Sequence, residues 1–218
     1  KTGLKLNTIN RYRASIKAFL NFSIRRKYIY ENPLRYIKEY KVPKNPPRFL
    51  TKDEISAVIK EAKKTDLYPM VATAIYTGMR RAELFALEWQ DLDFKQNIIT
   101  VRNKSDFTTK SKKFRIIPIS PILRPILVKI RQKEGHCFDI INQRRVVNRI
   151  LRNAKVKNTG IAWHLFRHTF GTQLAMAGVD VVTIKELMGH ESVETTMIYL
   201  HAVGSHVKDS IGKLKLRF

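Results

Sequence analysis

The strongest constraint on this chain is its excess of positive charge. Its 218 residues include 42 lysines and arginines but only 18 aspartates and glutamates, which gives a net charge of +24. A compact domain with that charge repels itself unless a polyanion lies close to it. Nucleic acid is the usual partner of such a domain, and an anionic membrane surface is the alternative. A lysine-rich surface that serves only solubility would spread its charge evenly, whereas the charge here is clustered.

Cysteine content and hydropathy narrow the setting in which the chain works. A single cysteine, Cys137, excludes an intramolecular disulfide and fits a reducing compartment, so we expect a cytoplasmic protein with this small side chain in its core. No apolar run approaches the roughly 20 residues that cross a bilayer, so no membrane-spanning segment is predicted. The first residue is Lys1 rather than methionine, which leads us to expect a further N-terminal portion.

Residues 1–46 form a basic segment with helical periodicity. They carry 12 basic and 2 acidic residues, a net charge of +10. Apolar residues recur at helical spacing from Ile9 to Leu20, and Pro33 is placed to open a short second helix. Because two helices cannot bury a core, we interpret the segment as the end of a larger helical domain, followed by a proline-containing linker.

The remainder, residues 47–218, is predicted to be a second domain that mixes helical and strand patterns. A capping box at 51–54 begins a helix. Two runs, 98–102 and 114–119, are predicted as strands of a hairpin with a long basic tip at 103–113. The predicted fold is mainly α with a small antiparallel β-sheet (α+β). Further helices are expected from Pro69 to Gly78, around 121–132 and 143–154, and from Trp163 onward with breaks at Gly178 and Gly189.

Two motifs carry residues that suit an anionic substrate, although each also has an ordinary structural interpretation. Arg80 follows a glycine turn and precedes Glu83 by three residues, which alone usually marks a helix start with a surface ion pair. His164 and Arg167 share one helical face, and arginine forks around phosphate oxygens while histidine moves protons near neutral pH. His164 and His168 have metal-ligand spacing, but no glutamate lies between them and no third ligand is nearby, so no metal is predicted.

Two further motifs lie near the end of the chain and in the hairpin. His190 follows the glycine stop, and Tyr199 comes nine positions later on a short helix, where a tyrosine is usually a packing residue. The hairpin stretch from Thr109 to Lys113 contains several lysines and would ordinarily be a solvated turn. Each signal is weak alone, and their order along the chain makes them informative together.

In that order, the motifs resemble the tyrosine recombinase family of phage and transposon integrases. The resemblance runs from about residue 5 to residue 201 and includes parts of residues 1–46, through Thr-Ile-Asn-Arg-Tyr-Arg and Glu-Asn-Pro-Leu. The matching stretches are Thr-Gly-Met-Arg-Arg-Ala-Glu-Leu, Thr-Lys-Ser-Lys-Lys-Phe-Arg-Ile-Ile-Pro-Ile, His-Leu-Phe-Arg-His-Thr-Phe, Leu-Met-Gly-His and Thr-Thr-Met-Ile-Tyr.

The resemblance implies a site-specific DNA recombinase or integrase that cuts and rejoins strands through a 3′-phosphotyrosyl intermediate. Tyr199 is then the nucleophile, and a phenol leaves as readily as it attacks, so the linkage is reversible. Arg80 and Arg167 supply the charge that stabilises the five-coordinate phosphorus, as a metal ion would elsewhere. Neither a metal nor a nucleotide cofactor is expected, because the tyrosyl ester preserves the bond energy.

The same resemblance assigns the remaining catalytic roles. Lys110 protonates the departing 5′ oxygen, His164 assists proton transfer at the tyrosine, and His190 donates a hydrogen bond to the phosphate. Lys104 stays an alternative to Lys110, because the hairpin tip is longer than the family's compact hairpins. The expected phosphate contacts in residues 1–46, the end of the core-binding domain that precedes the catalytic domain, are Arg11, Arg13, Lys17, Arg25 and Arg26.

The implied partners are a double-stranded DNA recombination site and other copies of the chain. The family's C-terminal tails pack on a neighbouring subunit, so we expect residues after His201 to support a tetramer on DNA. Three alternatives stay open at this point: a non-enzymatic DNA-binding protein with the same fold, a monomeric type IB topoisomerase-like enzyme, and a basic membrane-surface protein. The target sequence, the directionality partners and the choice between phage, transposon and chromosome resolution are not readable from the chain.

Overall fold

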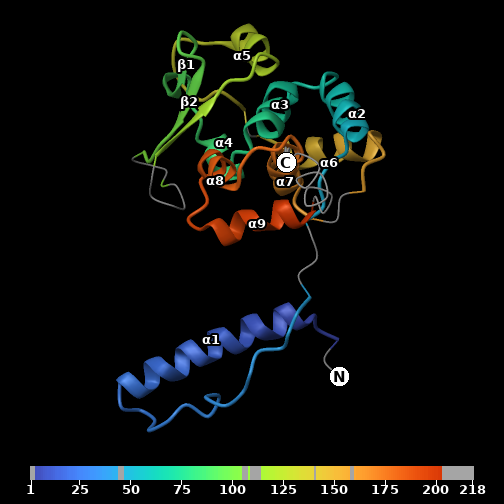
Figure 1. Cartoon of the computed structure of the whole chain (residues 1–218). Coiled ribbons are helices and arrows are strands. Elements are labelled where there is room, and N and C mark those ends of the chain that lie inside the picture. Colours follow the sequence, from blue (N-terminus) through green and yellow to red (C-terminus); the bar gives the residue numbers. More distant parts are fainter. Residues whose placement is uncertain are drawn as a thin grey trace, which may run out of the picture. The chain divides into compact units, whose positions relative to one another are not determined.

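The structure of the chain is a computed structural model that describes residues 3–43, 47–104, 108, 114–139, 141–157 and 160–202. The chain forms two compact units, Lys1–Asn45 and Pro46–Phe218. Figure 1 shows the first as a long helix with a returning segment, and the second as a helical body that carries a small sheet. Within the described ranges, no helix combines the length and the hydropathy needed to span a membrane.

The first unit consists of α1 (Leu6–Arg25) and an irregular segment that returns along it. The prediction of a short second helix after Pro33 is wrong, because residues 33–36 form a single turn. The side chain of Asn32 accepts a hydrogen bond from the Leu34 backbone N–H at 2.9 Å, which closes the turn without continuing it.

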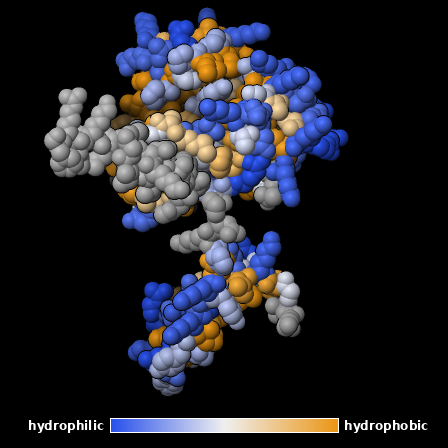
Figure 2. Space-filling view, turned by 45° about the vertical axis from the view of Figure 1, so that its right-hand side comes forward, coloured by the Kyte–Doolittle hydropathy of each residue, from blue (hydrophilic) through white to orange (hydrophobic). Residues whose placement is uncertain are grey.

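The apolar face of α1 is open to solvent. Tyr12 is 51% exposed and Phe19 is 66% exposed, and Figure 2 shows such hydrophobic residues on the surface of this unit beside hydrophilic ones. Among the described residues of the unit, only Ser23 and Asn32 are buried. The described residues of this unit therefore form no hydrophobic core of their own.

The second unit is mainly helical with one antiparallel sheet, which confirms the predicted fold class. The helix α7 contacts α3, α6, α8 and α9, so it lies at the centre of the unit (Figure 1). The elements are α2 (Lys52–Ala62), α3 (Tyr68–Thr77), α4 (Arg81–Phe85), η1 (Trp89–Asp91), β1 (Leu92–Asp93), β2 (Ile98–Val101), β3 (Arg115–Pro118), α5 (Leu123–Ile130), α6 (Gln143–Asn153), α7 (Ala162–Met176), α8 (Val181–Met188) and α9 (Val193–Ala202).

The sheet has the strand order β1-β2-β3, and both pairs are antiparallel. Ile99 pairs with Ile117 in the register of β2 and β3, and both side chains are buried. Because side chains alternate between the two faces of a strand, Arg115 lies on the same inner face as Ile117. The sheet therefore directs one arginine into the body of the unit. Most of the predicted hairpin tip, including Lys110, lies outside the described residues.

Local sequence signals place several helix ends as predicted. Thr51 and Glu54 form the expected capping box, with hydrogen bonds of 3.2 and 2.9 Å between side chains and backbone N–H groups. The helices α3 and α8 end at Gly78 and Gly189, whose φ values of 61° and 63° lie in the left-handed region that favours glycine. Cys137 is buried among apolar residues, as expected for a core position.

Candidate active site

The C-terminal end of α8 collects three arginine side chains from three different elements. A helix leaves the carbonyl groups of its last turn without intrahelical partners, and its dipole concentrates negative charge there. Three successive carbonyl oxygens at this end each accept a hydrogen bond from a different guanidinium. The bonds run from Arg115 Nε to Leu187 O (2.9 Å), from Arg167 Nη2 to Met188 O (2.6 Å) and from Arg80 Nη2 to Gly189 O (2.7 Å).

Glu83 holds two of these arginines from the opposite direction. Its carboxylate accepts two hydrogen bonds from Arg115, at 2.9 and 2.6 Å, and one from Arg80 Nη1 at 2.9 Å. A fourth bond comes from the Arg80 backbone N–H at 2.8 Å. Burial raises the pKa of Glu83, but the hydrogen bonds and charges of both arginines outweigh burial and lower this pKa to about 2. Glu83 is therefore a buried anion that positions two cations.

Arg167 is fixed by two helix ends at once. Its Nη1 donates to the carbonyl oxygen of Gly78 at 2.7 Å, where α3 ends, while its Nη2 donates to the end of α8. A Cβ atom at Gly78 would lie 2.3 Å from the ring of Phe170, so the close approach of α3 to α7 requires glycine. Burial, and then the charge of Arg80, lower the pKa of Arg167 to about 10, which leaves the guanidinium charged at neutral pH.

The two predicted histidines both lie close enough to this cluster to feel the charges of Arg80 and Arg167. His164 is exposed near the start of α7, and partial burial together with the charges of Arg167 and Arg81 lowers its pKa. His190 follows the end of α8, and its Nδ1 lies 2.8 Å from Oγ1 of Thr196. Burial and then the nearby arginines lower the pKa of His190 to about 3, so its imidazole is neutral at physiological pH.

Tyr199 packs against α7 with its hydroxyl group buried. The side chain is 1% exposed, and its ring stacks on His190 with 6.1 Å between ring centroids. A Cβ atom at Gly171 would lie 2.8 Å from Cε2 of Tyr199, so the ring lies directly on the helix backbone. Burial raises the pKa of Tyr199 to about 12, against the opposing influence of Arg167 and Arg80.

Of the two candidate lysines, the structure describes only Lys104. Lys110 lies outside the described residues. The Nζ atom of Lys104 lies 2.6 Å from Asp91, 3.2 Å from Glu88 and 2.5 Å from the carbonyl oxygen of Ala86. Two carboxylates and a carbonyl therefore surround the Lys104 ammonium group.

The basic residues predicted to contact DNA phosphates all belong to the first unit and are not part of the arginine cluster. Arg11, Arg25 and Arg26 are exposed, and Lys17 is half-buried. Arg13 lies 3.5 Å from the carboxylate of Glu39 in an ion pair. Four of the five side chains thus have no carboxylate partner among the described salt bridges.

Several residues of the candidate site and of the basic surface were not predicted from the sequence. Arg115 could have been found from strand alternation, because it shares its parity with the apolar Ile117. His168 contacts Tyr199, and its position one turn after His164 on the same helical face was visible in the sequence. The helix α6 buries one face and exposes a basic one, whose arginines are Arg144, Arg145, Arg149 and Arg152.

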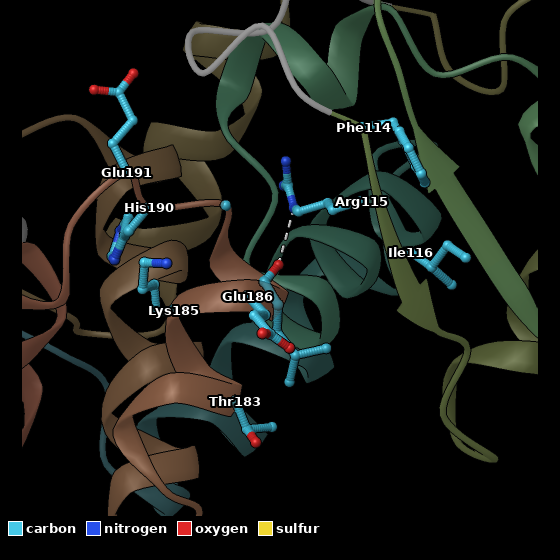
Figure 3. Close-up of a pocket in the computed structure, with 10 residues that line it drawn as sticks. Phe114, Arg115, Ile116, Thr183, Lys185, Glu186, His190 and Glu191 are labelled. Carbon is cyan, nitrogen blue, oxygen red and sulfur yellow. Dashed lines mark hydrogen bonds between the residues drawn. The ribbon is translucent and has the colours of Figure 1, made fainter.

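A cavity of about 500 Å³ adjoins the cluster between β3 and α8. Figure 3 shows Arg115 extending from β3 toward α8, with Phe114 and Ile116 on the strand side and Lys185 and His190 on the other. A Cβ atom at Gly189 would lie 2.8 Å from Nη1 of Arg115, so glycine permits this approach. In the described part of the chain, no group of three or more His, Cys, Asp or Glu residues is arranged to hold a metal ion.

Comparison with known proteins finds relatives of this chain. The model of the phage integrase family matches residues 48–206. A tyrosine recombinase of Thermosipho africanus (strain TCF52B) is 32% identical to this chain over 219 residues, which cover 95% of this chain and 76% of the relative.

Solved structures share the fold. The catalytic domain of bacteriophage HP1 integrase has 28% sequence identity and a TM-score of 0.63, and the match covers 78% of this chain and 96% of that domain. The XerH site-specific recombinase, bound to a palindromic difH substrate in a post-cleavage complex, has a TM-score of 0.77 at 19% identity. This second match covers 98% of this chain and 69% of that chain, and at that identity it speaks for the fold alone.

Proposed function

The chain belongs to the phage integrase family and is a tyrosine recombinase, and from this premise we propose that it integrates or excises a mobile element at a specific DNA site. The reaction cuts one strand and joins the 3′ phosphate to the hydroxyl oxygen of Tyr199. The observation that carries this proposal is the arginine cluster at the end of α8, which lies next to the buried Tyr199.

Charge stabilisation is the part of the reaction for which the cluster is best suited. Negative charge builds on the nonbridging oxygens as phosphorus becomes five-coordinate. The described hydrogen bonds use two of the five N–H donors on each of Arg80 and Arg167, so donors remain for a phosphate. Because Glu83 and the helix ends hold both side chains in place, little reorganisation is needed when charge develops.

His190 is suited to donate a hydrogen bond to the phosphate. When the Thr196 hydroxyl donates to Nδ1 of the neutral imidazole, the ring proton resides on Nε2. That N–H can then point at a nonbridging oxygen. His164, exposed on the same helix as Arg167, is proposed to assist proton transfer around the tyrosine.

Lys110 is proposed as the acid that protonates the departing 5′ oxygen. The alternative, Lys104, is surrounded by the carboxylates of Asp91 and Glu88, which favour a structural role for its ammonium group. The proposed catalytic group therefore consists of Tyr199, Arg80, Arg167, the two histidines and Lys110.

Residues 1–46 are proposed to be the end of a core-binding domain that holds the DNA, and residues 47–218 the catalytic domain. The exposed apolar face of α1 supports this division, because such a face needs further helices to cover it. Arg11, Lys17, Arg25 and Arg26 offer phosphate contacts, with Arg13 partly engaged by Glu39. Affinity falls with salt, and each phosphate contact makes the slope of log affinity against log salt more negative by about 0.9, so charge-removing variants should flatten that slope.

The protein is further proposed to assemble as a tetramer on two DNA duplexes in the cytoplasm. The segment from 203 to 218, which lies outside the described residues, is the proposed contact between neighbouring subunits. Deleting residues 203–218 should reduce the DNA-bound tetramer to smaller assemblies in sedimentation measurements. An unchanged tetramer in the deleted protein would rule out this role of the tail.

The central test is the capture of DNA on Tyr199. The protein is incubated with a pool of nicked duplexes that share a randomised region, and adducts resistant to denaturant are isolated and sequenced. We expect a defined site, joined through its 3′ phosphate. Tyr199→Phe should give no adduct, whereas Tyr76→Phe, the same change at a partly buried tyrosine of α3, should behave like the unmodified protein.

Three outcomes would contradict the proposal. Absence of any adduct with the unmodified protein would favour a DNA-binding protein without activity. An adduct that persists in Tyr199→Phe would place the nucleophile elsewhere. Relaxation of supercoiled plasmid by a monomer, without a paired site, would assign the chemistry to a topoisomerase-like enzyme.

A further inference from the structure

The hydroxyl group of Tyr199 is engaged by His168, a residue with no role in the function proposed above. Nδ1 of His168 lies 3.1 Å from the hydroxyl oxygen of Tyr199, and the ring centroids are 5.8 Å apart. In the part of the chain that the structure describes, the Tyr199 hydroxyl makes its side-chain hydrogen bond with this nitrogen of His168. His164 is exposed, and its ring centroid lies 6.5 Å from that of His168.

Packing keeps the two groups together. His168 and Gly171 lie three residues apart on one face of α7, and the tyrosine ring rests on that face. The ring of His190 stacks on Tyr199 at an interplanar angle of 10°. Since the Tyr199 side chain is 1% exposed, bulk water does not reach its hydroxyl, and a proton that leaves the phenol needs an acceptor within the protein.

In the resting site the phenol of Tyr199 holds its proton, and the neutral imidazole of His168 has one unprotonated nitrogen. Burial, followed by the charges of His164 and Arg167 on the same helix, lowers the pKa of His168 to about 4. The ionisable groups that face His168 from the other elements are Tyr199 on α9 and His190 before it. At neutral pH, His168 is therefore neutral and Tyr199 is protonated, and with the imidazole proton on Nε2 the phenol donates its hydrogen bond to Nδ1.

We propose that His168 is a catalytic residue whose Nδ1 accepts the proton of Tyr199 as the tyrosine attacks DNA. This inference rests on the proposed function, because it requires Tyr199 to be the nucleophile. The O–H bond of Tyr199 breaks and an N–H bond forms on His168. Phosphorus gains a bond to the tyrosine oxygen and loses its bond to the 5′ oxygen, which leaves with the electron pair and takes a proton from the ammonium group of Lys110. In rejoining, each proton returns along the same path.

The assignment is tested by single-turnover cleavage of the DNA captured in the central test, prepared as a nicked duplex. His168→Asn keeps a polar atom near the position of Nδ1 but cannot accept a proton. The matched control is His136→Asn, the same change at an exposed histidine after α5. Adduct formation is measured from pH 5.5 to 9, and DNA affinity and urea unfolding are measured for each protein to show that it is folded.

We expect His168→Asn to form the adduct on the order of 10²–10⁴-fold more slowly than the unmodified protein, because a positioned general base contributes that much. The rate of the variant should also rise about tenfold per pH unit, since phenolate must then form by equilibrium with solvent. The unmodified protein and His136→Asn should show no such rise. If His168→Asn does not fold, His168→Gln is measured in the same way.

Other outcomes overturn the inference and are distinguishable from failure of the proposed function. A variant as fast as the unmodified protein, or one that is slowed by the same factor at every pH, shows that His168 only packs against or orients Tyr199. In both cases the unmodified protein still forms its adduct, so Tyr199 remains the nucleophile. Absence of an adduct with the unmodified protein refutes the proposed function and this inference together.

Discussion

Replacement of Glu83 by glutamine should remove an acid-sensitive part of the stability of the catalytic unit. The Glu83 side chain is 1% exposed and accepts four hydrogen bonds, from the Arg115 and Arg80 side chains and the Arg80 backbone. Glutamine has nearly the same shape but no charge, and its amide group would face guanidinium donors. Removing one partner of a buried ion pair typically costs about 3–5 kcal/mol, so we expect Glu83→Gln to lose a free energy of unfolding of that order at pH 7.

The dependence on pH follows from the lowered pKa of Glu83. Its value falls from 4.5 to about 2 on folding, and at about 1.4 kcal/mol per pH unit this contributes about 3 kcal/mol to folding. Because the folded pKa is lowered, this stabilisation is complete above the unfolded value and is lost as pH falls from 4.5 to about 2. Between pH 6 and pH 3, the unmodified protein should therefore lose about 2 kcal/mol more than Glu83→Gln.

The measurement is urea unfolding at pH 6, 4 and 3, followed by the fluorescence of the two tryptophans. Other carboxylates contribute equally to the unmodified protein and the variant, so the difference between the two curves isolates Glu83. Glu134→Gln, at an exposed carboxylate, is the matched control and should follow the unmodified protein. Parallel stability curves for Glu83→Gln and the unmodified protein would refute the assignment of a buried, charged Glu83.

Three further predictions concern the same unit. Gly171→Ala should cost about 1–3 kcal/mol in urea unfolding and slow adduct formation, because its Cβ would meet the Tyr199 ring at 2.8 Å; an unaffected rate would contradict this. Lys104→Met should destabilise the protein by about 3 kcal/mol, yet the folded variant should still form the adduct. Lys110→Ala should form the adduct only with a substrate that has sulfur at the 5′-bridging position, because that leaving group needs no proton. If Lys110→Ala fails to cleave the sulfur substrate, Lys110 is not the acid. His190, with a pKa of about 3, should stay neutral from pH 5 to 8 in ¹⁵N NMR spectra, and a titration midpoint in that range would refute its burial among arginines.

Much of the fold could be predicted because its signals are local. The capping box of Thr51 and Glu54 acts over three residues, and a glycine ends a helix through its own φ angle. The two longer strands were recognisable from their β-branched runs and lie within a residue of the predicted ends. The failure after Pro33 has a local cause as well, because the Asn32 side chain closes a single turn that proline alone did not predict.

The sequence by itself determined which residue types are present for phosphate chemistry, and their order made Tyr199 the expected nucleophile. Only the tertiary structure decided how they are held. The carbonyl groups that bind Arg80 and Arg115 lie 109 and 72 residues away in the chain, and no local pattern encodes contacts across that separation. Likewise, the partner of the Tyr199 hydroxyl is His168 because α7 and α9 pack closely at a glycine, and that proximity arises only when the helices fold against each other.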